Sequence, residues 1–165
     1  MDYRSNEVKR KTDFVRSDLN FDPFPVADAS FDLVTAFQIL EHLENPFFVM
    51  REVKRILRKG GLFVFSVPNP YNLVYRLRYL FTGNMPAWRL DNNHLLFLTK
   101  DVFQKTYLSE FELVEKIYQR GSFPFWGTLR NLRFIFGSYF AAKNRKILPP
   151  SELLSVRTCY VLRKK

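Results

Sequence analysis

Two histidines and the residues beside them are the strongest candidates for chemistry in this sequence. His42 directly follows Glu41, and His94 is the only other histidine among the 165 residues. An imidazole titrates near neutral pH, so either ring could remove a proton from a hydroxyl group. A histidine that only supports the structure through hydrogen bonds is the alternative for His42, and the sequence alone leaves both roles open.

Apolar runs and helix-capping residues predict the elements that must position these histidines. Each expected strand is a short apolar or alternating run, and each expected helix carries apolar residues at helical spacing. We expect strands over residues 14–18, 31–37, 62–67, 111–118 and 157–163. We expect helices over residues 46–59, 72–81, 99–109 and 128–140. Asn45 should cap the first helix and Gly60 should end it.

The segment 31–67 reads as a strand, a helix and a strand, which is a βαβ unit. It predicts an α/β fold with a mostly parallel sheet, helices on both faces and a late antiparallel strand pair. The continuous apolar run 31–37 is typical of a strand buried on both faces. Because ligands of open α/β sheets bind beyond the carboxyl ends of the strands, three segments could line a site. They are Asp18-Leu19, residues 36–42 and residues 66–69.

The length of 165 residues suits a single domain. We expect four parts along it: an arm or helix remnant over 1–12, a core over 13–69, a helical lid over 70–98, and a region of helix and strand over 99–165.

Composition narrows the class of partner and the compartment. The formal net charge of +10 favours anionic partners, but the basic residues are scattered along the chain, a pattern that does not favour nucleic acid. Cys159 is the single cysteine, which excludes an internal disulfide and a cysteine metal cluster. Residues 1–11 are too polar for a secretory signal, and no apolar run approaches the ~20 residues that span a bilayer. We therefore expect a cytoplasmic protein, with peripheral membrane contact left open.

Several short motifs, taken in order, resemble the middle of the class I S-adenosylmethionine-dependent methyltransferases. They are Phe14-Val15-Arg16-Ser17-Asp18, Pro23-Phe24-Pro25, Ser30-Phe31-Asp32-Leu33-Val34, Leu40-Glu41-His42-Leu43, the run from Arg55 to Gly61, and Val67-Pro68-Asn69. No single motif is specific, but together across residues 14–69 they form a strong signal. Asn93-His94-Leu95 and the last strand are similar, more loosely, to the type 11/23-like branch. The resemblance implies a partial Rossmann-like fold and S-adenosylmethionine as cofactor.

The resemblance also implies a role for five residues in holding the cofactor. Asp18 would accept a hydrogen bond from the exocyclic amine of the adenine, and the Leu19 backbone would contact the ring. Ala36, Phe37 and Gln38 would line the pocket near the methionine part. The alternatives are that Asp18 only caps a turn and that Phe37 belongs to the core.

By the same resemblance, His42 and His94 would be catalytic residues beside the transferred methyl group. Either could deprotonate a hydroxyl acceptor, while the activated sulfonium needs mainly alignment and exclusion of water. Together with Glu41 they resemble part of a metal site of some relatives. Gln38 stands where those relatives carry a second carboxylate, so we predict no metal.

The glycine-rich loop of the family is absent from this sequence. The six glycines stand at positions 60, 61, 83, 121, 127 and 137, so none forms a Gly-x-Gly and none precedes Asp18. Such a loop lets the backbone approach the cofactor closely. We therefore expect an N-terminally truncated, incomplete domain. The isolated chain should bind S-adenosylmethionine weakly or not at all.

The favoured function is methyl transfer to a hydroxyl or similar acceptor of a small or lipid-like molecule, impaired in this chain alone. The second hypothesis is a non-catalytic basic module that binds an anionic membrane or nucleic acid. Apolar helical faces over 73–81 and 129–140 are flanked by arginines, which suits a membrane surface. Alternatively, these helices roof the substrate pocket.

Overall fold

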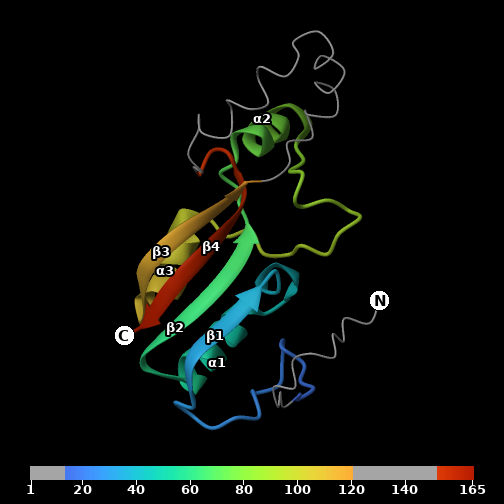
Figure 1. Ribbon diagram of the computed structural model, residues 1–165. Helices are drawn as coiled ribbons and strands as arrows, with labels where there is room; N and C mark the ends of the chain where they lie inside the picture. The colour runs from blue at the N-terminus through green and yellow to red at the C-terminus, as the bar shows by residue number, and fades with distance from the viewer. Residues whose placement is uncertain (1–13, 121–151) are drawn as a thin grey trace, which may run out of the picture.

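A four-stranded sheet forms the centre of the computed structural model, which describes residues 14–120 and 152–165 (Figure 1). The strands are β1 (Phe31–Phe37), β2 (Leu57–Pro68), β3 (Phe111–Arg120) and β4 (Ser155–Lys164), and their order in the sheet is β1-β2-β4-β3. β1 and β2 are parallel, whereas β4 is antiparallel to both of its neighbours, β2 and β3.

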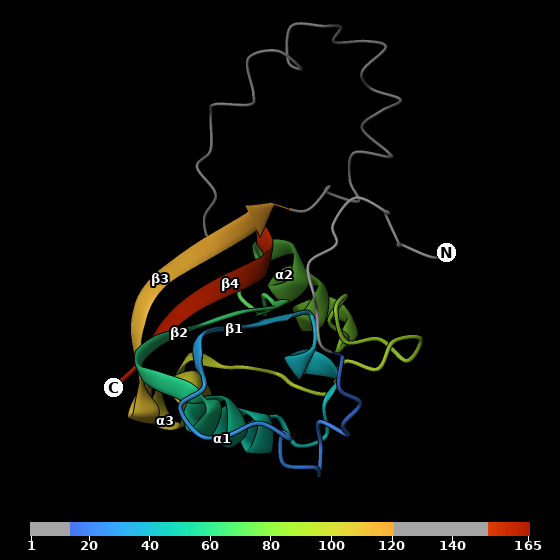
Figure 2. The same cartoon turned by 60° about the horizontal axis from the view of Figure 1, so that its bottom comes forward.

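The predicted α/β class is confirmed, and so is the late antiparallel pair, β3 and β4. The prediction of a mostly parallel sheet is wrong for the described residues, because β4 returns along β2 and makes a second antiparallel pairing. Within the described residues, the prediction of helices on both faces of the sheet is also wrong. The helices α1 (Pro46–Ile56) and α3 (Lys100–Glu110) lie against the same face of the sheet (Figure 2).

The expected first strand does not form. Residues 14–18 are irregular, and Phe14 and Val15 are exposed. The carbonyl of Asp18 accepts hydrogen bonds from the backbone N–H groups of Phe21 and Asp22, at 3.3 and 2.9 Å. The chain therefore turns at Asp18 and does not pair with the sheet.

β1 is confirmed over residues 31–37, but it is not buried on both faces. Phe31, Leu33 and Phe37 are exposed, and only Ala36 is fully buried. Among the described strands β1 lies at the edge of the sheet, so one of its sides has no pairing partner in that part of the chain.

α1 starts as predicted, because the side chain of Asn45 accepts a hydrogen bond from the backbone of Phe48 at 3.2 Å. It ends at Ile56, earlier than expected, because Leu57 already pairs with β1. Gly60 therefore lies inside β2. Its φ of 78° falls where the register between β1 and β2 shifts, a backbone conformation that glycine adopts without strain.

The remaining predicted elements are confirmed with small changes of boundary. The helix expected over 72–81 is α2 (Leu73–Thr82), capped by Asn72, and it lies beyond the end of β2 (Figure 1). Thr99 caps α3 through a hydrogen bond from the backbone of Val102 at 3.3 Å. The expected helix over 128–140 and the expected arm over 1–12 lie outside the described residues. Among the described residues, no helix is long and apolar enough to cross a bilayer.

An aromatic layer between the sheet and α3 forms much of the core. Phe63 and Phe65 of β2 stack at 4.9 Å between ring centroids, and Phe65 stacks on Tyr160 of β4 at 5.2 Å. Phe103 of α3 packs on Tyr160 at 4.6 Å. These contacts bury the rings and fix the position of α3 against β2 and β4.

A buried amide network connects the end of β2 to the start of β4. The Asn69 side chain is 1% exposed and donates to the backbone carbonyl and the hydroxyl of Ser155, at 2.9 and 2.7 Å. Asn72 donates to the same carbonyl at 2.9 Å. These bonds hold the carboxyl end of β2, where the predicted site lies, against β4.

Replacing Asn69 with alanine should therefore destabilise the fold by about 1–3 kcal/mol, since buried partners at Ser155 lose their donor. Urea unfolding followed by circular dichroism measures this difference. Asn84→Ala is the matched control, because Asn84 is exposed and bonds only within its own turn, and it should change stability by less than about 0.5 kcal/mol. Equal stabilities of the two variants would contradict the role of the network.

Candidate active site at the carboxyl ends of β1 and β2

β1 and β2 end at the same edge of the sheet because they are parallel neighbours. The backbone N–H of Gln38 donates toward the carbonyl and the hydroxyl oxygen of Ser66, at 3.4 and 3.2 Å. Two of the three predicted segments, 36–42 and 66–69, are thus brought together. Ala36 is buried in the core, so it can offer only its backbone to a ligand, whereas Phe37 is 55% exposed at the edge.

Gln38 faces β4. It has a left-handed backbone conformation, with φ at 54°, which directs the chain away from the strand axis. With its amide oxygen turned toward Arg157, the side chain accepts hydrogen bonds from Nε and Nη2 at 2.7 and 2.8 Å. Both residues line a cavity of about 460 Å³ with Phe37 and Ser66. Arg157 was not among the predicted site residues, because only the antiparallel pairing of β4 with β2 brings it here.

Asp18 and Leu19 lie in a turn that is tied to the segment following β1. The Asp18 carboxylate accepts a hydrogen bond from the backbone of Asn20 at 2.9 Å, which is the turn-capping role. The Asn20 side chain in turn accepts hydrogen bonds from the backbones of Glu44 and Asn45, at 2.9 and 3.2 Å. The turn therefore lies beside the start of α1. Recognition of adenine by Asp18 and Leu19 stays a prediction.

Glu41, His42 and His94 form a compact cluster. Glu41 and His42 belong to a short 3-10 helix, η1 (Leu40–His42), just beyond β1. The Glu41 carbonyl accepts hydrogen bonds from the backbones of Leu95 and Leu96, at 2.6 and 3.2 Å, and this pairing brings His94 to the cluster. One ligand atom from each of the three side chains lies within 4.8 Å of the others.

The hydrogen bonds of the two imidazoles define which ring nitrogens are available. Nδ1 of His94 lies 2.5 Å from the carbonyl oxygen of Ala87, which can only accept, so this nitrogen carries the proton. Nδ1 of His42 lies 2.6 Å from the amide oxygen of Asn93 and donates in the same way. Each neutral ring therefore keeps a lone pair on Nε2. The ring centroids are 4.7 Å apart in an edge-on arrangement.

The Glu41 side chain is fully buried, and neither carboxylate oxygen has a hydrogen-bond partner in the described part of the chain. Burial raises the pKa of this carboxyl, and the nearby His42, His94 and Arg157 oppose that effect only in part. The carboxyl and the two imidazoles each offer an atom within 4.8 Å of the others, so three titratable groups share one cluster. The same three groups are a donor set that a divalent cation accepts. Gln38, bonded to Arg157, adds no fourth ligand, and the absence of a metal stays a prediction.

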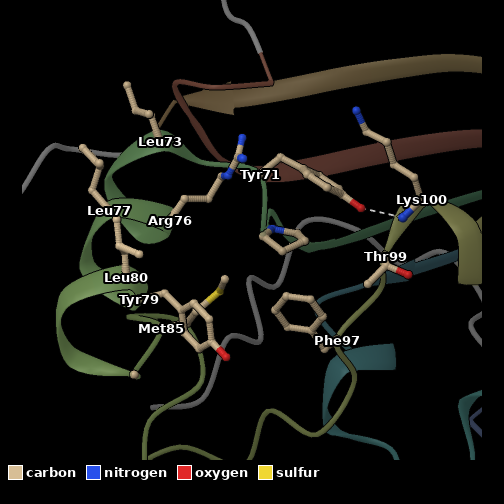
Figure 3. A pocket seen from close by; sticks show the side chains of 12 residues that line it. Tyr71, Leu73, Arg76, Leu77, Tyr79, Leu80, Met85, Phe97, Thr99 and Lys100 are labelled. Atoms are coloured by element: carbon tan, nitrogen blue, oxygen red, sulfur yellow. Dashed lines mark hydrogen bonds between the residues drawn. The ribbon is translucent and has the colours of Figure 1, made fainter.

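A larger cavity of about 1010 Å³ lies between α2 and the segment 97–100 (Figure 3). Figure 3 shows Arg76 extending from α2 toward Tyr71, whose hydroxyl accepts a hydrogen bond from the backbone of Lys100 at 2.5 Å. Phe97 and Met85 form its apolar floor. The sequence predicts a helical lid over 70–98, which stays a prediction, but it does not predict this cavity, because residues 85 and 97 carry no pattern that places them opposite the helix.

Known proteins resemble this chain in sequence and in fold. A family model described as a methyltransferase domain matches residues 1–65. A probable S-adenosylmethionine-dependent methyltransferase of Mycolicibacterium smegmatis is 44% identical over 50 residues, which cover 30% of this chain and 20% of that protein. A dimethylglycine N-methyltransferase of Parasynechococcus marenigrum is 43% identical over 51 residues, covering 31% and 18%.

Residues 1–65 are therefore similar in sequence to a methyltransferase domain. The predicted resemblance to the family is confirmed. The description of the Mycolicibacterium relative names S-adenosylmethionine as its cofactor. The matched segment spans about a fifth of the length of these curated relatives.

Solved structures extend the likeness of fold along the chain. A SAM-dependent methyltransferase from Archaeoglobus fulgidus has a TM-score of 0.57 at 14% identity, covering 94% of this chain and 69% of that one. The [4+2]-cyclase SpnF has a TM-score of 0.59 at 15% identity, covering 98% and 60%. The second structure is named for a cyclase, so the shared fold does not by itself fix the reaction.

The buried Glu41 carboxyl yields a prediction about pH. Because its pKa is raised in the folded state above the ordinary value of 4.5, its contribution to stability is greatest below that value and is lost as the pH rises through the folded pKa. Glu41→Gln, which stays neutral, should therefore gain stability relative to the unmodified chain as the pH increases from about 4 to about 8.

Urea unfolding at a series of pH values measures the difference between the two proteins. Glu44→Gln, three residues further along and exposed, is the control and should show no such trend. A difference between Glu41→Gln and the unmodified chain that is constant with pH would show that the Glu41 carboxyl keeps an ordinary pKa.

Proposed function

We propose that this chain carries out S-adenosylmethionine-dependent methyl transfer to a hydroxyl or similar acceptor of a small or lipid-like molecule. The observation that carries the proposal is the cluster of two imidazoles and a buried carboxyl at the carboxyl ends of β1 and β2. This edge is where an α/β sheet binds its ligands. The domain match over residues 1–65 supports the cofactor.

The cofactor supplies an activated methyl group on a sulfonium, so the protein has to hold it, align the acceptor and receive a proton. Asp18 and Leu19 would hold the adenine. The exposed ring of Phe37, with the backbone of Ala36 and Gln38, would hold the methionine part.

His42 and His94 are the proposed proton acceptors, since each keeps a lone pair on Nε2. His42 or His94 would take the proton of the acceptor hydroxyl as its oxygen bonds to the methyl carbon and the methyl–sulfur bond breaks. S-adenosylmethionine would supply the activated methyl group, and the electron pair of the broken bond would stay on sulfur. The Glu41 carboxyl, buried beside both rings, would stabilise the imidazolium once it ionises.

We further propose that the 165-residue chain by itself has a low affinity for the cofactor. The sequence supplies no Gly-x-Gly loop for close approach of the backbone to the ligand. The contacts offered by Asp18, Leu19 and Phe37 are then only part of what a complete adenosyl pocket provides. The methyl-transfer activity of this chain should be correspondingly impaired.

Calorimetry with S-adenosylhomocysteine measures this affinity directly. We expect weak binding, with a dissociation constant of about 0.1–1 mM, which is on the order of 4–5.5 kcal/mol. Asp18→Ala should weaken it further by about tenfold, the value of one lost hydrogen bond to the ligand. Asp91→Ala, at an exposed ion pair with Arg89, is the control. Micromolar binding would overturn the claim of low affinity, and equal affinities of Asp18→Ala and the unmodified chain would overturn the proposed role of Asp18.

Methyl transfer itself is tested with radiolabelled S-adenosylmethionine and a panel of phenols and long-chain alcohols, with product counted after extraction. His42→Ala and His94→Ala should each lower the rate by about 10²–10⁴-fold if the ring accepts the proton. Asn93→Ala, which removes only the partner of His42, should have a smaller effect. Full activity in both histidine variants would exclude them as proton acceptors.

A further inference from the structure

α2 presents an apolar stripe that the described part of the chain leaves exposed. None of its ten residues, Leu73–Thr82, is buried, and Leu80 and Phe81 are 73% and 80% exposed. A single exposed leucine is ordinary, but in this helix only Val74 and Tyr75 are half-buried, and the leucines and Phe81 stay exposed. Packing on the sheet explains the apolar residues of α1 and α3, but it does not explain the exposed apolar residues of α2.

The stripe is continuous and is bordered by positive charge. Successive residues of an α-helix differ by about 100° around its axis, so Leu73, Leu77, Leu80 and Phe81 fall within an arc of about 100°. Arg76 lies on one side of this arc and Arg78 on the other. The segment 73–82 contains no acidic residue. Neither arginine forms an ion pair with a residue of 14–120 or 152–165.

The two arginines have side chains long enough to reach outward from the helix while their apolar stems lie along it. Figure 3 shows Arg76 and Leu77 extending from different sides of α2, Arg76 toward Tyr71 and Leu77 away from it. An occupant of this face must therefore accept apolar side chains in its interior and positive charges at its margin. The surface of an anionic bilayer has this structure, with acyl chains beneath a negatively charged headgroup layer.

We propose that α2 docks this protein on anionic membranes, with Leu77, Leu80 and Phe81 inserted among the acyl chains and Arg76 and Arg78 against the headgroups. The net charge of +10 adds a long-range attraction toward such a surface. The docking does not depend on the proposed methyl transfer. Arg76, Leu77 and Leu80 also line the cavity between α2 and Phe97, so the docking would open this cavity toward the bilayer, where an amphiphilic molecule could enter it.

Co-sedimentation of the 165-residue chain with vesicles tests the docking. Vesicles of phosphatidylcholine with added phosphatidylglycerol should bind the chain, and vesicles of phosphatidylcholine alone should bind it far less. Arg76→Ala combined with Arg78→Ala should lower the partition coefficient by about 30-fold at low salt. Leu80→Ser combined with Phe81→Ser should lower it at least tenfold, also at high salt, because insertion is not screened.

The matched control removes two positive charges elsewhere: Arg51→Ala with Lys105→Ala, exposed residues of α1 and α3. It should change the partition coefficient by less than threefold, and far-UV circular dichroism checks that all three double variants fold. Absence of vesicle binding, an equal loss in the control, or unchanged binding after Leu80→Ser with Phe81→Ser would each overturn the proposal. Tighter retention on duplex DNA than on the vesicles would overturn it as well and indicate a nucleic-acid partner.

Discussion

The candidate site depends on the backbone carbonyl of Glu41. This one oxygen accepts hydrogen bonds from two consecutive N–H groups, those of Leu95 and Leu96, and so joins the exit of β1 to a segment more than fifty residues away. This pairing, together with the hydrogen bond from His42 to Asn93, brings His94 beside His42, since neither imidazole lies in a regular element that packs on the other. The side chain of the same residue is fully buried, so Glu41 contributes both the backbone oxygen of this pairing and the carboxyl of the cluster.

Local sequence signals anticipated most of the elements around this point. Asn45, Asn72 and Thr99 are short polar residues ahead of apolar-periodic segments, and each one caps its helix as such residues do. The strands 31–37 and 62–67 were identifiable because apolar runs between turn-forming residues have few other stable solutions. The proximity of residues 36–42 to 66–69 followed from the parallel pairing of those two strands.

Features that depend on the pairing of strands far apart in the sequence could not be predicted from local sequence signals. An alternating pattern such as that of residues 157–163 gives no indication of which neighbour a strand joins, and β4 pairs with β2 as well as with β3. The position of Arg157 beside Gln38 follows only from that arrangement. The run at residues 14–18 was predicted as a strand because it begins with the apolar pair Phe14-Val15. The backbone hydrogen bonds at Asp18 and the exposure of Phe14 show a turn instead. Composition cannot distinguish a short strand from a chain that approaches a turn.

The place of β4 between β2 and β3 has a consequence for how the molecule assembles. β2 gains its second neighbour only when residues 155–164 arrive, about ninety positions later, so closing that loop carries a large entropic cost before any pairing compensates it. Until β4 pairs with β2, the ring of Phe65 lacks its stacking partner Tyr160, and one edge of β2 keeps its backbone hydrogen-bonding groups unpaired. An unpaired strand edge is a template for association with another chain, so a partly folded molecule is prone to aggregate before β4 docks.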